Sequence, residues 1–574
     1  MTMMKKILSA ILICALLLPC ASSAFAADET GRYSDDTIVR IGLLYGDNTV
    51  ESFETSAPYG FELGYILKNG TEFVSLGTTE LTRFTVARNE NLGLTSAGKY
   101  FVATSNLTMG KYHVEYGNEF KTLKQAYEFI AQLNALGVDY AFPCFINDKI
   151  KVRSHDRTSA ERAQASLEQI KGIVGSKYKL SVTKPSSNAL VLIDPTNNDI
   201  VYLVDCPDKN LAVKAAQKKG EAPGYIMTPA KNTYPGCFEY RRVSAGIELI
   251  NVMTLGEYVK GVLPWEINPN WHGEALKAFS TVVRTYTLYQ RNKHSSSHFM
   301  LCNTVHCQVY NGYNRSTDAS NAAVDATRDQ VITYDGKLID AVYSSSVGGQ
   351  TANHNEVWGG TFRFPYLAAV TTPWENYEDY NNGKWANEVT PSDLASYLKN
   401  VSSYRGSFSG FGSSVSKIVP TYSESSGYVI SVTVYDNNGK SVTIKNADPI
   451  RSTFGRYANS ANMIIYLRFK QRVNSSEGRQ NIDTGRIYTI SGTNRIEQYK
   501  GTGENIQIMT ANGIETLKSS RFTYVFDGKG WGHGVGLSQY GMLDLANTGE
   551  TWKNIIRAYY TGVKIHPADE LELK

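Results

Sequence analysis

The stretch LGEYVKGVLPWEINPNWHGEALKAFSTVVRTYTLYQ, residues 255–290, decides the fold of the largest part of this chain. From residue 274 to residue 290, apolar side chains recur at the spacing of one helix face, which predicts a buried helix. These side chains are Ala275, Phe279, Val282 and Tyr286. The segment before this helix is rich in Pro, Asn and Gly, which disfavour regular structure. We therefore expect Glu266 to lie in a loop between a strand-like run and the helix.

Glu266 is the residue of this stretch best suited to acid–base chemistry. Its neighbours Trp265 and Ile267 are apolar, and apolar surroundings raise the pKa of a carboxyl group toward the range of a general acid. The competing interpretation is an ordinary surface glutamate, because most loop carboxylates take no part in chemistry. Glu274, in the first turn of the predicted helix, has a simpler role as a partner of the helix dipole.

The first residues of the chain predict export. Lys5 and Lys6 precede an apolar run at residues 7–18, and Ala24-Phe25-Ala26 forms a small-x-small cleavage site. This is the pattern of a secretory signal peptide at residues 1–26. The apolar run is shorter than the roughly 20 residues of a membrane-spanning helix, although an uncleaved anchor stays an alternative. We expect a secreted or cell-wall-associated protein that is cleaved near Ala26.

Composition narrows the class of protein. The 574 residues exceed one hydrophobic core and predict several domains. The formal net charge is +4 and includes the two leader lysines, so no strongly basic domain argues for a nucleic-acid partner. The cysteines that follow the leader are sparse and odd in number, which argues against a disulfide scaffold. They are Cys144, Cys206, Cys237, Cys302 and Cys307.

The pattern of short elements predicts a multidomain α+β protein. Residues 27–110 and 177–237 contain strand-like runs, and we interpret them as accessory β-rich segments, the second with a linker. Residues 111–176 repeat a strand–helix–strand plan twice, which is the plan of a small ferredoxin-like module. Residues 238–568 form the largest unit, which contains Glu266.

The module at residues 111–176 resembles the SPOR domain family. The resemblance is carried by KYHVEYGNEF, LKQAYEFIAQLNALGVDY and DKIKVRSHDRTSAERAQASLEQIK. Capping-box spacing places the helix starts at Thr122 and Thr158. The resemblance implies a module that binds glycan strands stripped of their stem peptides. The alternative is a ferredoxin-like module without a ligand, because a fold does not fix a function.

The stretch VLPWEINPNWHGEALKAFSTVVRTYTLY resembles the signature of the stage II sporulation protein D (SpoIID/LytB) family. Three further blocks follow in the order of that family, namely HCQVYNGY (306–313), VYSSSVGGQTANHNEVWGG (342–360) and GKGWGHGVGLSQYGMLDLANTGETWKNIIRAYYTGVKI (528–565). The resemblance implies a lytic transglycosylase that cleaves the MurNAc–GlcNAc linkage of peptidoglycan to a 1,6-anhydro product. Glu266 matches the catalytic glutamate of the family. Glu356 and Asp527 are open candidates for a second carboxylate beside it.

Two of these blocks supply candidate substrate-binding residues. They are Ser344, Ser345, Gly348, Gly349, His533, Gln539 and Tyr540. Glycines let a backbone approach a ligand closely, whereas the competing interpretation is a set of tight polar turns. The sequence GLSQYG nearly matches the nucleophile elbow G-x-S-x-G, but Tyr540 stands where the second glycine belongs, which argues against a serine hydrolase.

Two histidines and two cysteines between residues 298 and 307 form a candidate zinc site. We expect His298, Cys302, His306 and Cys307 to be the ligands, with His294 competing against His298. Some members of the SpoIID family hold zinc in this way. A Cys302–Cys307 disulfide and free thiols are the alternatives, since export permits oxidation. The metal would be structural, and we expect no organic cofactor.

Two rival functions stay open at this point. The LytB branch of the family is described as stimulating a cell-wall amidase, which would make this chain a non-catalytic enhancer with that amidase as its partner. The chain could instead only bind peptidoglycan glycan strands, with Glu266 as a passive contact. A cleavable leader also departs from the membrane-anchored sporulation protein, so a role in sporulation is open against vegetative wall remodelling.

Overall fold

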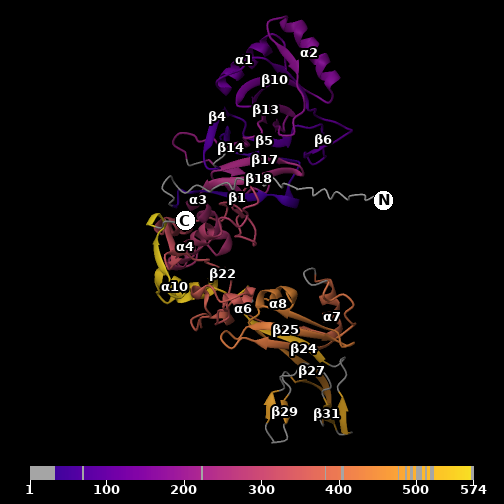
Figure 1. Ribbon diagram of the computed structural model, residues 1–574, viewed down its shortest axis with the longest axis vertical. Coiled ribbons are helices and arrows are strands. Elements are labelled where there is room, and N and C mark those ends of the chain that lie inside the picture. Colours follow the sequence, from indigo (N-terminus) through magenta and orange to yellow (C-terminus); the bar gives the residue numbers. More distant parts are fainter. Residues whose placement is uncertain are drawn as a thin grey trace, which may run out of the picture. The chain divides into compact units, whose positions relative to one another are not determined.

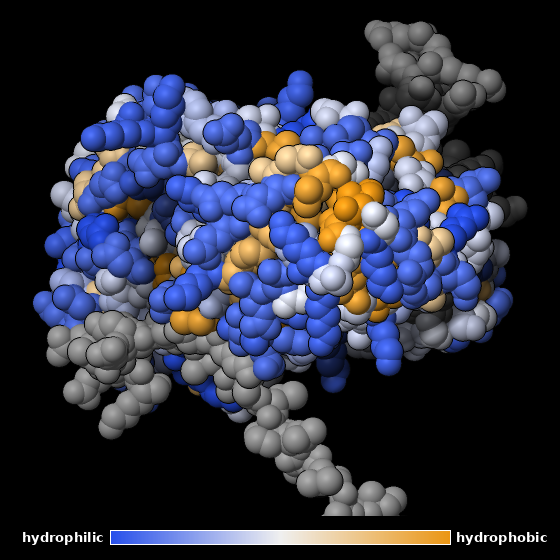
Figure 2. All heavy atoms as spheres, turned by 90° about the horizontal axis from the view of Figure 1, so that it is seen from above, coloured by the Kyte–Doolittle hydropathy of each residue, from blue (hydrophilic) through white to orange (hydrophobic). Residues whose placement is uncertain are grey.

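A computed structural model describes residues 33–67, 70–221, 224–381, 383–401, 406–475, 478–484, 488–490, 496–498, 507–510, 513–516 and 522–570. The predicted leader at residues 1–26 lies outside these residues. Within the described ranges, no helix has the length and apolar character needed to cross a membrane. Viewed from above, hydrophilic residues cover most of the surface, and hydrophobic residues gather near its middle (Figure 2).

The fold is mixed α+β with several sheets, as predicted, and the chain forms two compact units. The described part of the N-terminal unit consists of Ile38–Met253 and Arg291–Cys307. The C-terminal unit contains Thr30–Thr37, Thr254–Gln290 and Gln308–Lys574. The chain therefore passes from the second unit back to the first and returns.

Two sheets build the N-terminal unit. The seven-stranded sheet has the order β19 (Leu301–Cys302), β1 (Ile38–Leu44), β18 (Gly246–Thr254), β17 (Cys237–Val243), β14 (Leu211–Ala215), β3 (Phe61–Ile66) and β4 (Phe73–Thr79). The ten-stranded sheet has the order β11 (Leu180–Val182), β8 (Tyr112–Tyr116), β10 (Lys149–Arg157), β9 (Ala141–Ile146), β13 (Asp199–Asp205), β12 (Leu190–Asp194), β5 (Arg83–Arg88), β2 (Ser52–Ser56), β15 (Ile226–Met227) and β16 (Thr233–Tyr234). A short pair, β6 (Leu92–Leu94) and β7 (Tyr100–Val102), accompanies them.

The predicted strand–helix–strand repeats are present at one end of the ten-stranded sheet. Helices α1 (Leu123–Ala135) and α2 (Ala160–Val174) pack on its strands, near β10 in Figure 1. Thr122 caps α1 as expected, but Ser159 rather than Thr158 caps α2. The sheet continues beyond the repeats, because β9 pairs in parallel with β13.

Helices around α4 (Gly273–Tyr289) form one part of the C-terminal unit. They are α3 (Leu255–Glu266), α5 (Asp318–Ala326), α9 (Gln539–Asn547) and α10 (Trp552–Tyr559), and each packs against α4. Short strands join them, namely β20 (Gln330–Tyr334), β21 (Lys337–Leu338) and β35 (Lys564–Pro567) in one sheet and the parallel pair β22 (Tyr343–Ser344) and β34 (Leu537–Ser538).

A β-rich part completes the C-terminal unit. One sheet contains β23 (Lys384–Val389), β33 (Phe522–Lys529), β27 (Met463–Ser475) and β28 (Gly478–Thr484), and another contains β24 (Val415–Tyr422), β25 (Val429–Asp436) and β26 (Ser441–Lys445). Helices α6 (His354–Trp358), α7 (Pro391–Asn400) and α8 (Ala447–Thr453) accompany them, with the hairpins β29 (Tyr488–Ile490)–β30 (Ile496–Gln498) and β31 (Gln507–Thr510)–β32 (Gly513–Thr516). A shared apolar core joins the sheet that contains β23 to the sheet that contains β24.

Helix α4 is buried on all sides, whereas its sequence predicted a single buried face. The burial extends over polar residues, which satisfy their own hydrogen bonds. Thr285 and Thr287 donate to backbone carbonyls four residues earlier, at 2.7 and 2.8 Å. A helix that is buried all round lies in the centre of its unit.

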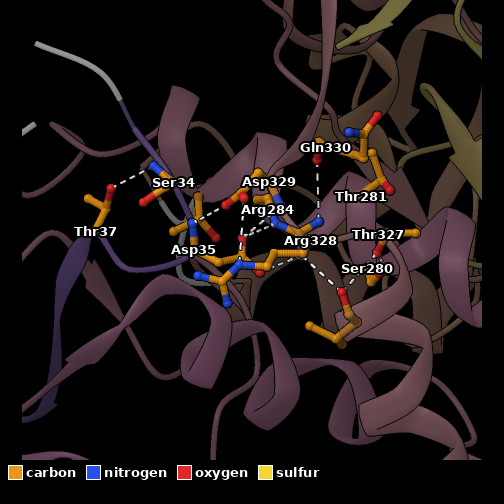
Figure 3. A network of polar contacts seen from close by, with 12 residues as sticks. Ser34, Asp35, Thr37, Ser280, Thr281, Arg284, Thr327, Arg328, Asp329 and Gln330 are labelled. Atoms are coloured by element: carbon orange, nitrogen blue, oxygen red, sulfur yellow. Dashed lines mark hydrogen bonds and ion pairs between the residues drawn. The ribbon is translucent and has the colours of Figure 1, made fainter. Parts of the chain in front are cut away.

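The buried polar residue with the largest side chain on α4 is Arg284, which is fully buried. Its guanidinium donates to both carboxylate oxygens of Asp35, at 2.5 and 3.0 Å, and to the carbonyl of Gln330 at 3.3 Å (Figure 3). Asp35 is 3% exposed, so both charges lie away from water and each depends on the other. The pair ties the segment before β1 to the central helix.

Removing one partner of this ion pair should strongly destabilise the C-terminal unit. We expect Arg284→Ala to lower its free energy of unfolding by about 3–5 kcal/mol, because a buried carboxylate is left uncompensated. Denaturant unfolding followed by tryptophan fluorescence measures the change. The exposed Arg328→Ala is the control, with an expected loss within about 0.5 kcal/mol. Equal losses in the two variants would contradict this account.

Candidate active site and metal centre

Glu266 is the last residue of α3, so the expected loop with a strand-like run before it was wrong. The helix begins at a capping box in which Thr254 and Glu257 bond each other's backbone N–H groups. Pro264 lies inside the helix and has no N–H for the carbonyl of Lys260, a position that normally disfavours a helix. The hydroxyl of Ser316 donates to that carbonyl at 3.1 Å and replaces the missing bond.

Burial and hydrogen bonds have opposing effects on the pKa of Glu266. Burial raises its pKa above the ordinary value, and hydrogen bonds from Val309, Tyr343 and Gln539 act in the other direction. The backbone N–H of Val309 donates to its Oε1 at 2.6 Å. Hydrogen bonds to a carboxylate stabilise its charged form, whereas burial stabilises its protonated form. Such a group can hold a proton and also release it.

Glu266 opens into a pocket of about 580 Å³ in the C-terminal unit. Its lining consists of Pro264, Trp265, Glu266, Ile267, Asn268, Pro269, Trp271, Arg315, Ser345, Gln539 and Tyr540. The ring of Tyr540 packs against Trp271 at 5.4 Å and stacks on Tyr380 at 4.1 Å between centroids. Aromatic side chains with polar tips suit ligands that have both apolar faces and hydroxyl groups.

The structure brings together part of the predicted substrate-binding set. Ser345, Gln539 and Tyr540 line the pocket with Glu266. Ser344, Gly348, Gly349 and His533 are not among its lining residues. A Cβ on Gly348 would approach Lys529 Cβ to 2.5 Å, so close packing accounts for this glycine. Burial lowers the pKa of His533 to about 4, and its ring packs against Trp358 at 5.1 Å.

The two open candidates for a second carboxylate do not line the pocket. Glu356 is in the capping box of α6 and accepts hydrogen bonds from Ser423, Ser425 and Ser426. Asp527 lies on β33. Glu356 therefore has a structural explanation in its own hydrogen bonds.

Glu375 is a buried carboxylate that sequence reasoning missed. It is 4% exposed and accepts hydrogen bonds from Ser346 Oγ at 2.6 Å, Ser538 Oγ at 2.9 Å and the Val347 N–H at 3.1 Å. Burial raises its pKa. Ser346 and Ser538 are the direct neighbours of Ser345 and Gln539, so Glu375 joins the two segments that line the pocket. It lies outside the quoted motifs, and only the fold brings it to these serines.

The metal-binding candidates in the N-terminal unit are His294, Cys302, His306 and Cys307. Their ligand atoms lie within 4.8 Å of one another. His294 Nε2 is 3.3 Å from Cys307 Sγ, and His306 Nδ1 is 3.5 Å from each of the two sulfur atoms. In a tetrahedral zinc site, bonds of about 2.0–2.3 Å separate sulfur and nitrogen ligands by about 3.5 Å. The donor set therefore fits a metal ion.

The structure corrects the first ligand of this set. His298 points elsewhere, because its Nδ1 lies 2.7 Å from the carboxylate of Glu248. His294, which competed with it in the sequence, takes the place beside the cysteines. A turn in which the Cys307 N–H donates to the Thr304 carbonyl at 3.0 Å lets adjacent His306 and Cys307 face one centre. Cys302 and Cys307 are not joined by a disulfide bond in this structure.

Part of this chain is similar to known proteins. Residues 243–334 match the model of the stage II sporulation protein (SpoIID) family. The chain is 31% identical over 311 residues to the amidase enhancer of Bacillus subtilis (strain 168), a match that covers 54% of this chain and 40% of the enhancer. It is 27% identical over 345 residues to stage II sporulation protein D of the same strain, covering 58% of this chain and 78% of that protein.

Stage II sporulation protein D of Bacillus amyloliquefaciens is 25% identical over 402 residues, which are 66% of this chain and 93% of that protein. The chain thus spans less than half of the amidase enhancer and most of the two sporulation proteins. The family-model match includes Glu266, Arg284 and the four candidate metal ligands. The region that contains Glu266 is therefore similar to the stage II sporulation protein (SpoIID) family.

Proposed function

We propose that the C-terminal unit is a lytic transglycosylase that cleaves MurNAc–GlcNAc linkages in peptidoglycan glycan strands, with Glu266 as its general acid and base. One observation carries this proposal. Among the described residues that line the pocket, Glu266 alone has a carboxyl group. Glycoside hydrolases typically use two carboxyl groups, one for the leaving oxygen and one for the nucleophile. A transglycosylase requires only one, because the sugar supplies its own nucleophile.

The proposed reaction begins with protonated Glu266. The carboxyl group gives its proton to the glycosidic oxygen, the bond from C1 of the muramoyl residue to that oxygen breaks, and positive charge develops at C1 and the ring oxygen. The resulting carboxylate takes the proton of the C6 hydroxyl, whose oxygen bonds to C1 and forms the 1,6-anhydro ring. Glu266 is then protonated again, and no water is consumed. The Val309 N–H at 2.6 Å stabilises the transient carboxylate.

We propose two further roles outside this pocket. The repeats at residues 111–176 serve as a SPOR-like module that binds stripped glycan strands, which would bring the pocket to its substrate. Four protein ligands make a closed site, so we propose that His294, Cys302, His306 and Cys307 hold one structural zinc ion that takes no part in the reaction. Both roles fit an exported protein whose leader is removed near Ala26.

The second candidate function is stimulation of a cell-wall amidase. Its support is the 31% identity to a protein named amidase enhancer. In that case the pocket would bind glycan without cleaving it, and the partner would be the amidase.

Replacing the carboxyl group tests the proposed reaction. We expect the mature protein to release fragments with 1,6-anhydro ends from stripped glycan strands, and Glu266→Gln to release at least about 1,000-fold less, because the proton donor is lost. Mass spectrometry of the fragments measures both. Glu424→Gln, which changes an exposed glutamate, is the control and should match the wild type. No fragments from the wild type, with amidase stimulation intact, would favour the enhancer.

The hydrogen bond from Tyr343 gives a prediction for pH dependence. The reaction starts from protonated Glu266, so kcat/KM should fall as the pH rises through the pKa of Glu266. The Tyr343 bond lowers this pKa, so its removal in Tyr343→Phe should raise the pKa and move the alkaline limb to higher pH. A kcat/KM profile measured on glycan strands checks the sign. A limb that stays in place or moves to lower pH would contradict the assignment.

The metal proposal is tested by a pair of histidine variants. We expect about one zinc ion per purified chain by elemental mass spectrometry, about the same content in His298→Ala, and a large loss in His294→Ala and Cys302→Ser, because each of the last two removes a ligand. Loss of zinc in His298→Ala with retention in His294→Ala would reverse the ligand assignment. A folded wild-type chain without metal would reject the site.

A further inference from the structure

Arg315 is a charged residue of the pocket that the proposed reaction does not use. It lines the pocket with Glu266, and these two are the only charged side chains among its described lining residues. Its guanidinium lies over the ring of Trp265, 4.1 Å from the centroid. The side chain is exposed, so a ligand can reach it.

The ring below Arg315 is fixed in place. The indole N–H of Trp265 donates to the carbonyl of Gly312 at 2.8 Å, and the hydroxyl of Tyr313 donates to the carbonyl of Glu257 at the same distance. These bonds fasten the segment that carries Arg315 to α3, which ends at Glu266. A guanidinium stacked on a held aromatic ring loses little further freedom when it binds a ligand.

The charge of Arg315 is not neutralised by a carboxylate among the described residues. No carboxylate of the described residues forms an ion pair with it. The groups that act on the pKa of Glu266 are its burial and its bonds from Val309, Tyr343 and Gln539, and Arg315 is not one of them. A stacked cation beside the proposed catalytic acid therefore faces whatever enters the pocket.

The geometry of a guanidinium selects the kind of ligand group. Its parallel N–H donors match the two oxygens of a carboxylate. Each muramoyl residue of a glycan strand carries a lactyl ether that ends in a carboxyl group. This group is a free carboxylate in a stripped strand and an amide where a stem peptide is attached, so only the stripped strand presents an anion.

We propose that Arg315 binds the free lactyl carboxylate of a muramoyl residue in this pocket and thereby selects strands without stem peptides. The inference rests on the proposed function, because it assumes a glycan strand in the pocket beside Glu266. An attached peptide would remove the charge that Arg315 recognises and would add bulk beside Trp265. Selection then occurs at the pocket itself, independently of the module at residues 111–176.

Binding to chemically matched strands tests this inference without requiring cleavage. Stripped strands are compared with the same strands after their lactyl carboxylates have been converted to methylamides with carbodiimide and methylamine. The protein carries Glu266→Gln, so that no strand is cut, and Kd is measured with Arg315 intact and as Arg315→Gln or Arg315→Lys. We expect about a tenfold to hundredfold preference for the carboxylate with Arg315.

The expected pattern separates recognition from folding. Arg315→Gln should bind both strands with the affinity that the parent has for the methylamide strand, and Arg315→Lys should keep a smaller preference because it retains charge without the fork. A preference that persists in Arg315→Gln, or that is absent in the parent, would overturn the inference. The proposed function would survive that result if the wild type still released 1,6-anhydro ends. Failure of every variant to bind either strand would overturn the inference, and absence of 1,6-anhydro ends from the wild type would overturn the proposed function.

Discussion

The buried ion pair between Arg284 and Asp35 is the interaction on which the C-terminal unit depends. Arg284 lies on α4, against which α3, α5, α9 and α10 pack. Glu266 is the last residue of α3 and Gln539 the first residue of α9, so the central helix sets the position of both sides of the pocket. Because an unpaired buried charge is costly, the ion pair holds the segment before β1 in one position against α4.

The pocket then subjects the pKa of one carboxyl group to opposing effects. Burial favours the protonated form of Glu266, and three hydrogen bonds favour its carboxylate. A general acid that must also act as a base requires this balance, since a fully desolvated carboxyl would not release its proton. Glu375 contributes from outside the pocket by joining the serines next to Ser345 and Gln539.

The sequence predicts the elements with strong periodicity, and three of the seven substrate-binding candidates in its motifs line the pocket. The repeats at residues 111–176, the long helix and the α+β class agree with the structure, and three predicted substrate-binding residues share the pocket with Glu266. The helix that ends at Glu266 was missed because Pro264 and Gly261 disfavour a helix locally, whereas Ser316 and tertiary packing restore it. His294 and His298 were indistinguishable by spacing, because His298 is held away from the cysteines by Glu248, a residue distant in the sequence. Glu375 and Arg315 carried no local signal, since their partners are distant in the sequence or belong to the ligand.

The central claim is that one carboxyl group cleaves the strand without water. Cleavage of stripped glycan strands in water enriched in ¹⁸O tests this claim most directly, because hydrolysis places solvent oxygen at the new reducing end and an internal C6 attack does not. We predict fragments that carry a 1,6-anhydro ring and no ¹⁸O. Fragments with ¹⁸O at C1 would contradict it and would require a nucleophilic water together with a second catalytic group.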